Sequence, residues 1–316
     1  MKGGKIMLKI FKSFGGYVET PKAAAGCWIN VVQPTQDEID RLQTEFVVPA
    51  DIIQDILDVD ERPRYEVDDD WSLIILRIPV ESPSNGVPYY TVPLGIFRVS
   101  NITITICSTI NEVLPFEKPA LYRGQNQLIH DELNFTIKLF LKSGSTYLSY
   151  LKQINQQTAR IEEELEKSIR NKELNKLLKM EKCLVFFITS LKANEIVLAK
   201  IRNAFKKSMT ELNEDLLEDA IIENKQALEM SQIYSDIQSG MMDAFASVIS
   251  NNLNVVMKQL ASISIILMIP TLIASLYGMN VPNNLEEKSW AFFAIVIFSA
   301  LMSVTGIIIF RKKDLF

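Results

Sequence analysis

The stretch NVVMKQLASISIILMIPTLIASLYGMN, residues 254–280, decides how the rest of the chain is organised. From Ala261 to Met279 it carries no charge. As a helix rising about 1.5 Å per residue, it is about long enough to cross a bilayer. Steps of three and four residues along this helix select small, hydroxyl-bearing or thioether side chains. The stripe consists of Asn254, Met257, Ala261, Ser264, Met268, Thr271, Ser275 and Gly278.

A helix with a polar stripe in lipid must turn that stripe toward protein or water. The residues alone leave two interpretations open. Small and hydroxylated residues are enriched where membrane helices pack tightly, and the same residues can form the wall of a pore shared by several subunits. The stepping also reaches Asp243 upstream, a candidate for a negative ring at the inner end of such a pore.

A second uncharged span covers residues 290–310, after a loop at 281–289 and before a basic tail at 311–316. Lys258 precedes the first span, and Arg311, Lys312 and Lys313 follow the second. The positive-inside rule therefore predicts a protein of the cell membrane with both termini in the cytoplasm. The first 16 residues do not resemble a secretory signal, because lysines interrupt their apolar run.

Composition excludes several function classes. The net charge is −5 and no basic stripe with interleaved aromatic residues occurs, so no nucleic-acid partner is expected. Three scattered cysteines without CxxC spacing indicate a reducing compartment, with neither a disulfide framework nor a zinc site. The chain has no P-loop, HExxH, GxSxG or dinucleotide motif, and its one histidine is His130, so we do not expect an enzyme.

Residues 1–125 alternate short strand and helix signals. Thr35, followed by Glu38, predicts a capping box for a helix through Thr44, and Pro49 begins a second short helix, ADIIQDIL. Apolar runs predict strands at 27–32, 71–80, 89–100 and 102–108. Neighbouring strands joined by short turns predict an antiparallel or mixed sheet covered by helices, an α/β (α+β) domain.

Residues 126–257 are predicted to form a helical stalk, and residues 258–280 the first membrane helix. Gly144 and Ser145 are predicted to interrupt the stalk, with a long helix beginning at Thr146. A second helix is expected at 172–205. The third helix begins near Thr210 and meets no proline before Pro270. If unbroken to Gly278, it would be on the order of 100 Å long.

The ending Tyr277-Gly278-Met279-Asn280 resembles the signature of the CorA magnesium-transporter family, in which Gly-Met-Asn closes the first of two membrane helices. The resemblance favours the pore interpretation. It implies a homopentamer surrounded by membrane lipid and a passive Mg²⁺ channel. It assigns selectivity to Gly278, Met279 and Asn280, whose neutral oxygens suit an ion that keeps its water shell. It also implies alternating polar and apolar rings formed by Asn254, Met257, Leu260, Ser264, Met268 and Thr271, with the inward placement of Leu260 resting on the resemblance more than on periodicity.

A second resemblance lies in residues 51–66, DIIQDILDVDERPRYE. In CorA proteins an aspartate matching Asp55 pairs across a subunit boundary with one on the stalk helix, here Asp219. This implies a regulatory Mg²⁺ site that holds the ring closed when occupied. From the residues alone, both aspartates read as ordinary solvated acids. Gln54 stands where some relatives carry a second carboxylate, so a second bridging ion is not expected.

The outer loop departs from the family pattern, since VPNNLEE stands where many relatives have Met-Pro-Glu-Leu. Glu286 and Glu287 keep its acidity and are candidates for concentrating cations at the entrance. The departure leaves Mg²⁺, Co²⁺, Ni²⁺ and Zn²⁺ open as substrates. Two alternatives to a Mg²⁺ channel therefore stand: a CorA-like zinc or cobalt/nickel transporter, and a non-conducting membrane-anchored coiled-coil scaffold.

Overall fold

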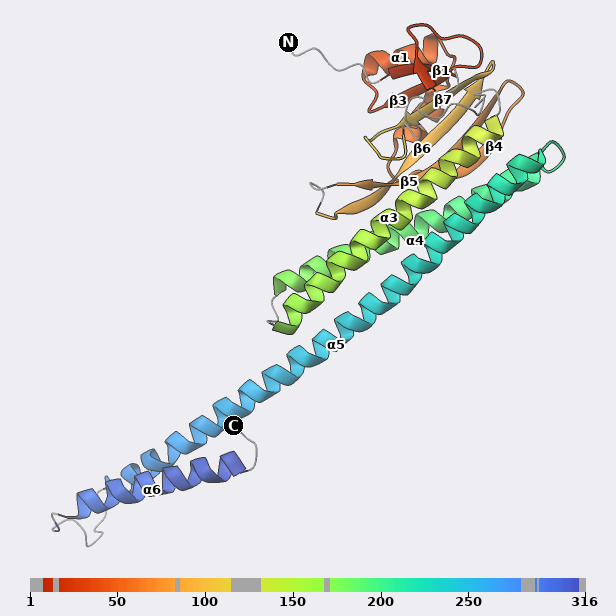
Figure 1. Ribbon diagram of the computed structural model, residues 1–316. Helices are drawn as coiled ribbons and strands as arrows, with labels where there is room; N and C mark the ends of the chain where they lie inside the picture. Colours follow the sequence, from red (N-terminus) through yellow and green to blue (C-terminus); the bar gives the residue numbers. More distant parts are fainter. Residues whose placement is uncertain are drawn as a thin grey trace. The chain divides into compact units, whose positions relative to one another are not determined.

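The computed structural model describes residues 8–13, 17–82, 86–114, 132–167, 171–279, 288 and 290–312. The chain forms two compact units, Met1–Gly240 and Met241–Phe316. In the first, helices α3, α4 and the beginning of α5 lie side by side next to a β-sheet (Figure 1). In the second, α6 lies along the C-terminal part of α5 (Figure 1).

The first unit is built on one seven-stranded mixed sheet with the order β2-β1-β3-β7-β6-β5-β4. Its described strands are β1 (Leu8–Ser13), β2 (Tyr17–Glu19), β3 (Trp28–Val32), β4 (Arg64–Val67), β5 (Trp71–Glu81), β6 (Tyr89–Val99) and β7 (Ile102–Cys107). Neighbouring strands are antiparallel except β3 and β7, which pair in parallel. The predicted mixed sheet and the adjacency of β5, β6 and β7 are confirmed.

Both faces of this sheet are buried. Successive side chains of a strand point to opposite sides, so one strand contributes to two cores. On β5, Leu73 and Ile75 belong to one core, while Ile74 and Leu76 belong to the other. Helices α1 (Gln36–Thr44) and α2 (Ala50–Leu57) contribute to the first core. Helices α3 (Glu132–Lys167), α4 (Asn171–Phe205) and the beginning of α5 (Glu211–Tyr277) contribute to the second. The α/β class predicted from the sequence is therefore confirmed.

The start of α1 has the predicted capping box. The Thr35 hydroxyl accepts a hydrogen bond from the Glu38 backbone N–H at 3.4 Å, and the Thr35 backbone N–H donates to the Glu38 carboxylate at 2.9 Å. Glu38 also accepts from the Leu8 N–H at 2.8 Å. One carboxylate thus caps the helix and ties it to β1, which the sequence pattern did not predict.

Three short strands, β1, β2 and β4, were not predicted from the sequence. In β1 the lysines obscured the pattern, although Leu8 and Ile10 are buried and Lys9 between them is exposed, as alternation requires. Strand β2 has three residues, too few for a recognisable period. Strand β4 lies at the sheet edge, and its residues RYEV carry little apolar surface.

The predicted interruption at Gly144 and Ser145 is wrong, because α3 runs through both residues from Glu132. Gly144 is a packing residue. A Cβ atom there would lie 2.8 Å from Cγ and 3.3 Å from Cβ of Glu223 on α5. Glycine therefore allows α3 and α5 to approach closely rather than ending the helix.

We expect Gly144→Leu to lower the free energy of unfolding by about 1–3 kcal/mol, because the new side chain must displace Glu223 and separate the helices. Chemical denaturation followed by circular dichroism would measure the change. Gly240→Leu is the matched control, since a Cβ atom at Gly240 would meet nothing within 4 Å. Equal effects at the two glycines would contradict the packing role of Gly144.

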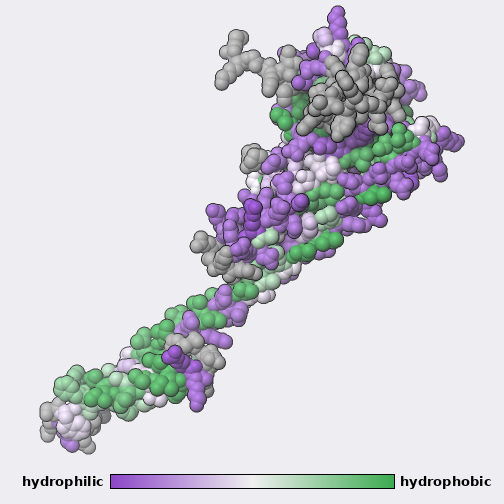
Figure 2. Space-filling model, in the orientation of Figure 1, coloured by the Kyte–Doolittle hydropathy of each residue, from purple (hydrophilic) through white to green (hydrophobic). Residues whose placement is uncertain are grey.

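The second unit contains the end of α5 and helix α6 (Ala291–Lys312). Helix α5 continues through Pro270 to Tyr277, as predicted. Among the described residues, α5 and α6 are the two helices long and apolar enough to cross a membrane. Figure 2 shows hydrophobic surface over most of this unit, in contrast to the mainly hydrophilic surface of the first.

Candidate ion pathway and regulatory carboxylates

Helix α6 packs against one defined face of α5. That face repeats every three or four residues and has buried Ser262 and Ile266, followed by the half-buried Ile269, Ile273 and Tyr277. A Cβ atom on Gly306 of α6 would lie 3.5 Å from Ile269 Cδ1 and 3.8 Å from Ile266 Cγ1. The two apolar helices are therefore in close contact through this face.

The polar stripe lies on the opposite side of α5. Ser264, Met268 and Thr271 each come two residues after a member of the packed face, which is about 200° around the helix. These three side chains are exposed in the single chain, and Met268 retains 68% of its accessible surface. Met257 and Leu260 are likewise exposed, at 57% and 58%. Packing against α6 therefore does not account for the stripe.

The hydroxyl groups of the stripe have a specific orientation. Ser264 Oγ donates to the Leu260 carbonyl at 2.8 Å, and Thr271 Oγ1 donates to the Leu267 carbonyl at 3.0 Å. Because each hydroxyl has one donor and two acceptor lone pairs, these bonds use the donor and leave the lone pairs for other partners. An exposed row of acceptors suits cations or the water molecules that surround them.

The end of α5 presents Gly278 and Met279. The Gly278 N–H donates to the Ala274 carbonyl at 2.9 Å, and Met279 is 53% exposed. Gly278 does not adopt the left-handed conformation that a glycine C-cap commonly uses. A simple capping role therefore does not explain the glycine. Asn280, Glu286 and Glu287 lie outside the described residues.

The two predicted regulatory aspartates belong to helices on opposite faces of the sheet. Asp55 is on α2, whose Ile52, Ile53 and Ile56 are in the core that contains α1. Asp219 is exposed on α5, whose neighbouring Leu217 and Ala220 are in the other core. Among the described residues, no group of three or more His, Cys, Asp or Glu side chains is placed to hold a metal ion. One subunit therefore does not bring the two aspartates together as a complete site.

Comparison with known proteins identifies the family. The family described as CorA-like Mg²⁺ transporter protein matches residues 23–313, which is nearly the whole chain. The chain belongs to the CorA family. This is a family of divalent-cation transporters of the membrane, not of enzymes.

Individual relatives agree with this assignment. The chain is 26% identical over 296 residues to the cobalt/magnesium transport protein CorA of Methanocaldococcus jannaschii, covering 90% of each protein. It is 23% identical over 312 residues to the protein of the same name from Thermotoga maritima, covering 90% of this chain and 82% of that one.

Solved structures share the fold. The complete CorA magnesium transporter of M. jannaschii superposes with a TM-score of 0.80 at 22% identity, over 98% of both chains. The full-length CmaX protein does so with a TM-score of 0.68 at 14% identity, over 97% of this chain and 99% of that one. The chain therefore has a full-length CorA fold, with an α/β domain and two apolar helices.

In this CorA-family chain, sequence reasoning missed a cluster around Asp55. Arg64, on edge strand β4, forms ion pairs with three carboxylates: Nη2 lies 2.6 Å from Asp55 Oδ2, Nε lies 2.7 Å from Glu66 Oε1, and Nη1 pairs with Glu61. Burial lowers the pKa of Arg64, but the hydrogen bond to Asp55 and the three nearby negative charges outweigh that effect and raise it. The alternation of acidic and basic residues in DERPRYE was the available signal.

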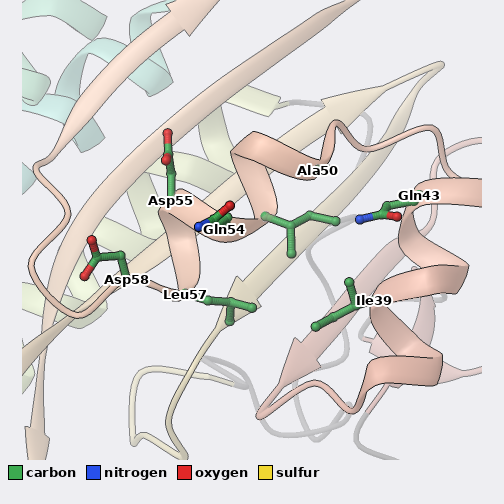
Figure 3. Close-up of a pocket in the computed structure, with 8 residues that line it drawn as sticks. Ile39, Gln43, Ala50, Gln54, Asp55, Leu57 and Asp58 are labelled. Carbon is green, nitrogen blue, oxygen red and sulfur yellow. The ribbon is translucent and has the colours of Figure 1, made fainter.

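Asp55 also borders an open groove between α1 and α2. The groove has a volume of about 510 Å³ and is lined by Ile39, Gln43, Ala50, Ile53, Gln54, Asp55, Leu57 and Asp58. Figure 3 shows Gln54, Asp55 and Leu57 on α2, with Ile39 and Gln43 of α1 across the groove. The side chains of Gln54, Asp55 and Asp58 are therefore accessible from outside the subunit.

A partly buried network connects the ion pairs of Arg64 to the helices of the same unit. The Arg77 guanidinium donates to the Glu61 carbonyl at 2.9 Å and to the Thr91 carbonyl at 2.8 Å. The Arg77 carbonyl accepts from Tyr147 of α3 at 3.0 Å and from Asn194 of α4 at 2.8 Å. Burial lowers the pKa of Arg77. Glu61 is therefore held through Arg77 to both α3 and α4.

Proposed function

We propose that this chain is one subunit of a homopentameric, passive Mg²⁺ channel of the cell membrane, with both termini in the cytoplasm. The observation that carries the proposal is that α6 packs on the side of α5 opposite the polar stripe, which leaves the stripe exposed. Two spans cannot surround a pore, so several copies must each supply one α5. A head-to-tail ring that closes by rotation meets that requirement.

The stripe residues take different roles in this channel. Asn254, Ser264 and Thr271 form polar rings that contact the hydrated ion, and Asp243 forms a negative ring at the inner end. Met257, Leu260 and Met268 form apolar constrictions that close by dewetting. Ser264 and Thr271 donate to the helix backbone and keep their acceptor lone pairs, which supports the polar-ring role.

The outer mouth selects the ion. Gly278, Met279 and Asn280 form a ring of neutral oxygens around a hydrated cation. Such a ring suits Mg²⁺, because this ion dehydrates reluctantly. Glu286 and Glu287, repeated around the ring, raise the local cation concentration. An inside-negative potential favours inward movement of a divalent ion by about 4.6 kcal/mol per 100 mV, so no nucleotide is needed.

Regulation comes from Asp55 and Asp219. Their positions on opposite faces of the sheet within one subunit support a pair formed between neighbouring subunits. Bound internal Mg²⁺ bridges the two carboxylates and holds the ring closed. Loss of the ion lets repulsion loosen the ring.

Co²⁺ is the second candidate substrate, since both curated relatives are named cobalt/magnesium transport proteins. Competitive uptake of Mg²⁺, Co²⁺, Ni²⁺ and Zn²⁺ into liposomes containing the purified protein would rank the ions. Faster uptake of Zn²⁺ or Ni²⁺ than of Mg²⁺ would replace the magnesium assignment.

Cysteine substitution tests the pore wall directly. We expect a positively charged thiol reagent to reduce Mg²⁺ flux through Ser264→Cys channels by on the order of tenfold, because a fixed charge beside the path repels a divalent cation. The three native cysteines are buried, and burial raises the pKa of Cys107 and Cys183 to about 11, so they react poorly at neutral pH.

Ile265→Cys is the matched control for this experiment. Ile265 is the next residue, is 48% exposed in the single chain, and lies about 100° around the helix from Ser264. The reagent should leave its flux unchanged. Equal block at both positions, or no block at Ser264→Cys, would contradict the pore-wall role. Absence of flux in unmodified protein at every internal Mg²⁺ concentration would favour a non-conducting scaffold.

A further inference from the structure

A cationic side chain already holds the carboxylate that the regulatory Mg²⁺ would use. Arg64 Nη2 lies 2.6 Å from Asp55 Oδ2, and the same guanidinium contacts Glu61 and Glu66. Guanidinium groups present five donors in a rigid plane and have no acceptor, so this one is matched to several carboxylates at once. Asp55 therefore has a resident counter-charge before any ion arrives.

The backbone holds Arg64 in this position. The residue is the first of β4 and pairs with Ile75 of β5, so its Cα is fixed by the sheet. Its side chain is 22% exposed, whereas that of Asp55 is 44% exposed. The guanidinium is thus largely enclosed while the carboxylate keeps an open side. An ion from solution can therefore approach Asp55 from its open side.

We infer that Arg64 is a positioning residue that competes with Mg²⁺ for Asp55 and sets the internal Mg²⁺ concentration at which the channel closes. The inference rests on the proposed regulatory role of Asp55. The guanidinium of Arg64 repels a dication at Asp55. It also neutralises one of the three negative charges of Asp55, Glu61 and Glu66. Both effects weaken Mg²⁺ binding.

The same contact protects the ion-free state. When Mg²⁺ leaves, Asp55 keeps its ion pair with Arg64 instead of becoming an unpaired carboxylate next to Glu61 and Glu66. Unpaired, partly buried charges destabilise a folded protein. Arg64 therefore allows the site to empty and refill without loss of the local fold.

The test is a Mg²⁺ titration of Arg64→Gln in the full-length protein, reconstituted in liposomes for flux and in detergent for thermal unfolding. Removing a unit positive charge beside a bound dication should lower the Mg²⁺ concentration for half-closure roughly tenfold. The concentration that gives half of the Mg²⁺-dependent rise in melting temperature should fall by a similar factor. A residue that only supports the fold would lower the melting temperature without moving either midpoint downward.

Arg62→Gln is the matched control, because Arg62 is exposed, lies two residues away and loses the same charge. Its midpoints should stay close to those of the unchanged protein. Arg64→Lys keeps the charge but not the planar fork, so its midpoints should fall only a few-fold. If Arg64→Gln does not fold, the Mg²⁺ midpoints of Arg64→Lys test the inference instead.

The outcomes separate this inference from the proposed function. If Asp219→Lys shifts the Mg²⁺ response but the midpoints of the Arg64 variants stay unchanged or rise, competition by Arg64 is wrong and the regulatory pair stands. If neither Asp55→Asn nor Asp219→Lys alters the response, the regulatory pair fails, and the role of Arg64 fails with it.

Discussion

Asn280→Ala should abolish selective Mg²⁺ uptake into liposomes while the oligomer remains assembled. The asparagine follows Gly278 and Met279 directly after α5 ends at Tyr277, and the proposed channel assigns one asparagine side-chain carbonyl from each copy to the outer mouth. Alanine removes those oxygens without adding charge. Without them, the mouth lacks the side-chain oxygens that accept hydrogen bonds from the water shell of the entering Mg²⁺.

Fluorescent measurement of Mg²⁺ influx, with Na⁺ and Ca²⁺ as competitors, would detect the loss. Asn284→Ala, in the loop that follows, provides a matched control, since it makes the same change outside the Gly-Met-Asn signature. Size-exclusion chromatography of each variant would report assembly. Undiminished and still selective influx through Asn280→Ala channels would refute the assignment of the filter.

Asp219→Lys should make the channel much less sensitive to internal Mg²⁺. Replacing a carboxylate by an ammonium turns attraction for the bridging dication into repulsion, which raises the Mg²⁺ concentration for half-closure by tenfold or more on a rough Coulomb estimate. The change should be tolerated by the fold, because Asp219 is exposed on α5. Flux recorded as a function of internal Mg²⁺ would measure it.

Glu218→Lys is the control for Asp219→Lys. It reverses the same charge on the preceding exposed residue, about 100° around the helix. A specific bridge predicts a large shift for Asp219→Lys and a small one for Glu218→Lys. An unchanged dose-response in Asp219→Lys would count against the bridge between Asp55 and Asp219, and equal shifts would indicate a general electrostatic effect.

The elements with strong local signals were predicted well. The capping box at Thr35 and Glu38, the apolar runs of β5 to β7 and the absence of proline from α5 before Pro270 each carry their own evidence in the sequence. The resemblance through YGMN added the family, and the match over residues 23–313 confirmed it.

The features that escaped prediction depend on contacts between distant residues. Glycine at 144 has the same appearance in the sequence whether it ends a helix or admits Glu223 of α5, and only the packed structure distinguishes the two. Likewise, Arg64 is nine residues from Asp55, and the turn before β4 is what brings the two charges together. The alternating charges in DERPRYE indicate ion pairs among neighbouring residues, but they do not show that Arg64 reaches Asp55.

The parallel pairing of β3 with β7 has a consequence for biosynthesis. Trp28 pairs with Thr103, so the N-terminal strands cannot join the rest of the sheet until the chain through β7 has left the ribosome. Loop closure over such a separation is slow, and the apolar edge of β3 is uncovered in the meantime. Nascent chains that end before Cys107 should therefore leave this edge of β3 unpaired, and those that extend past it can pair it with β7.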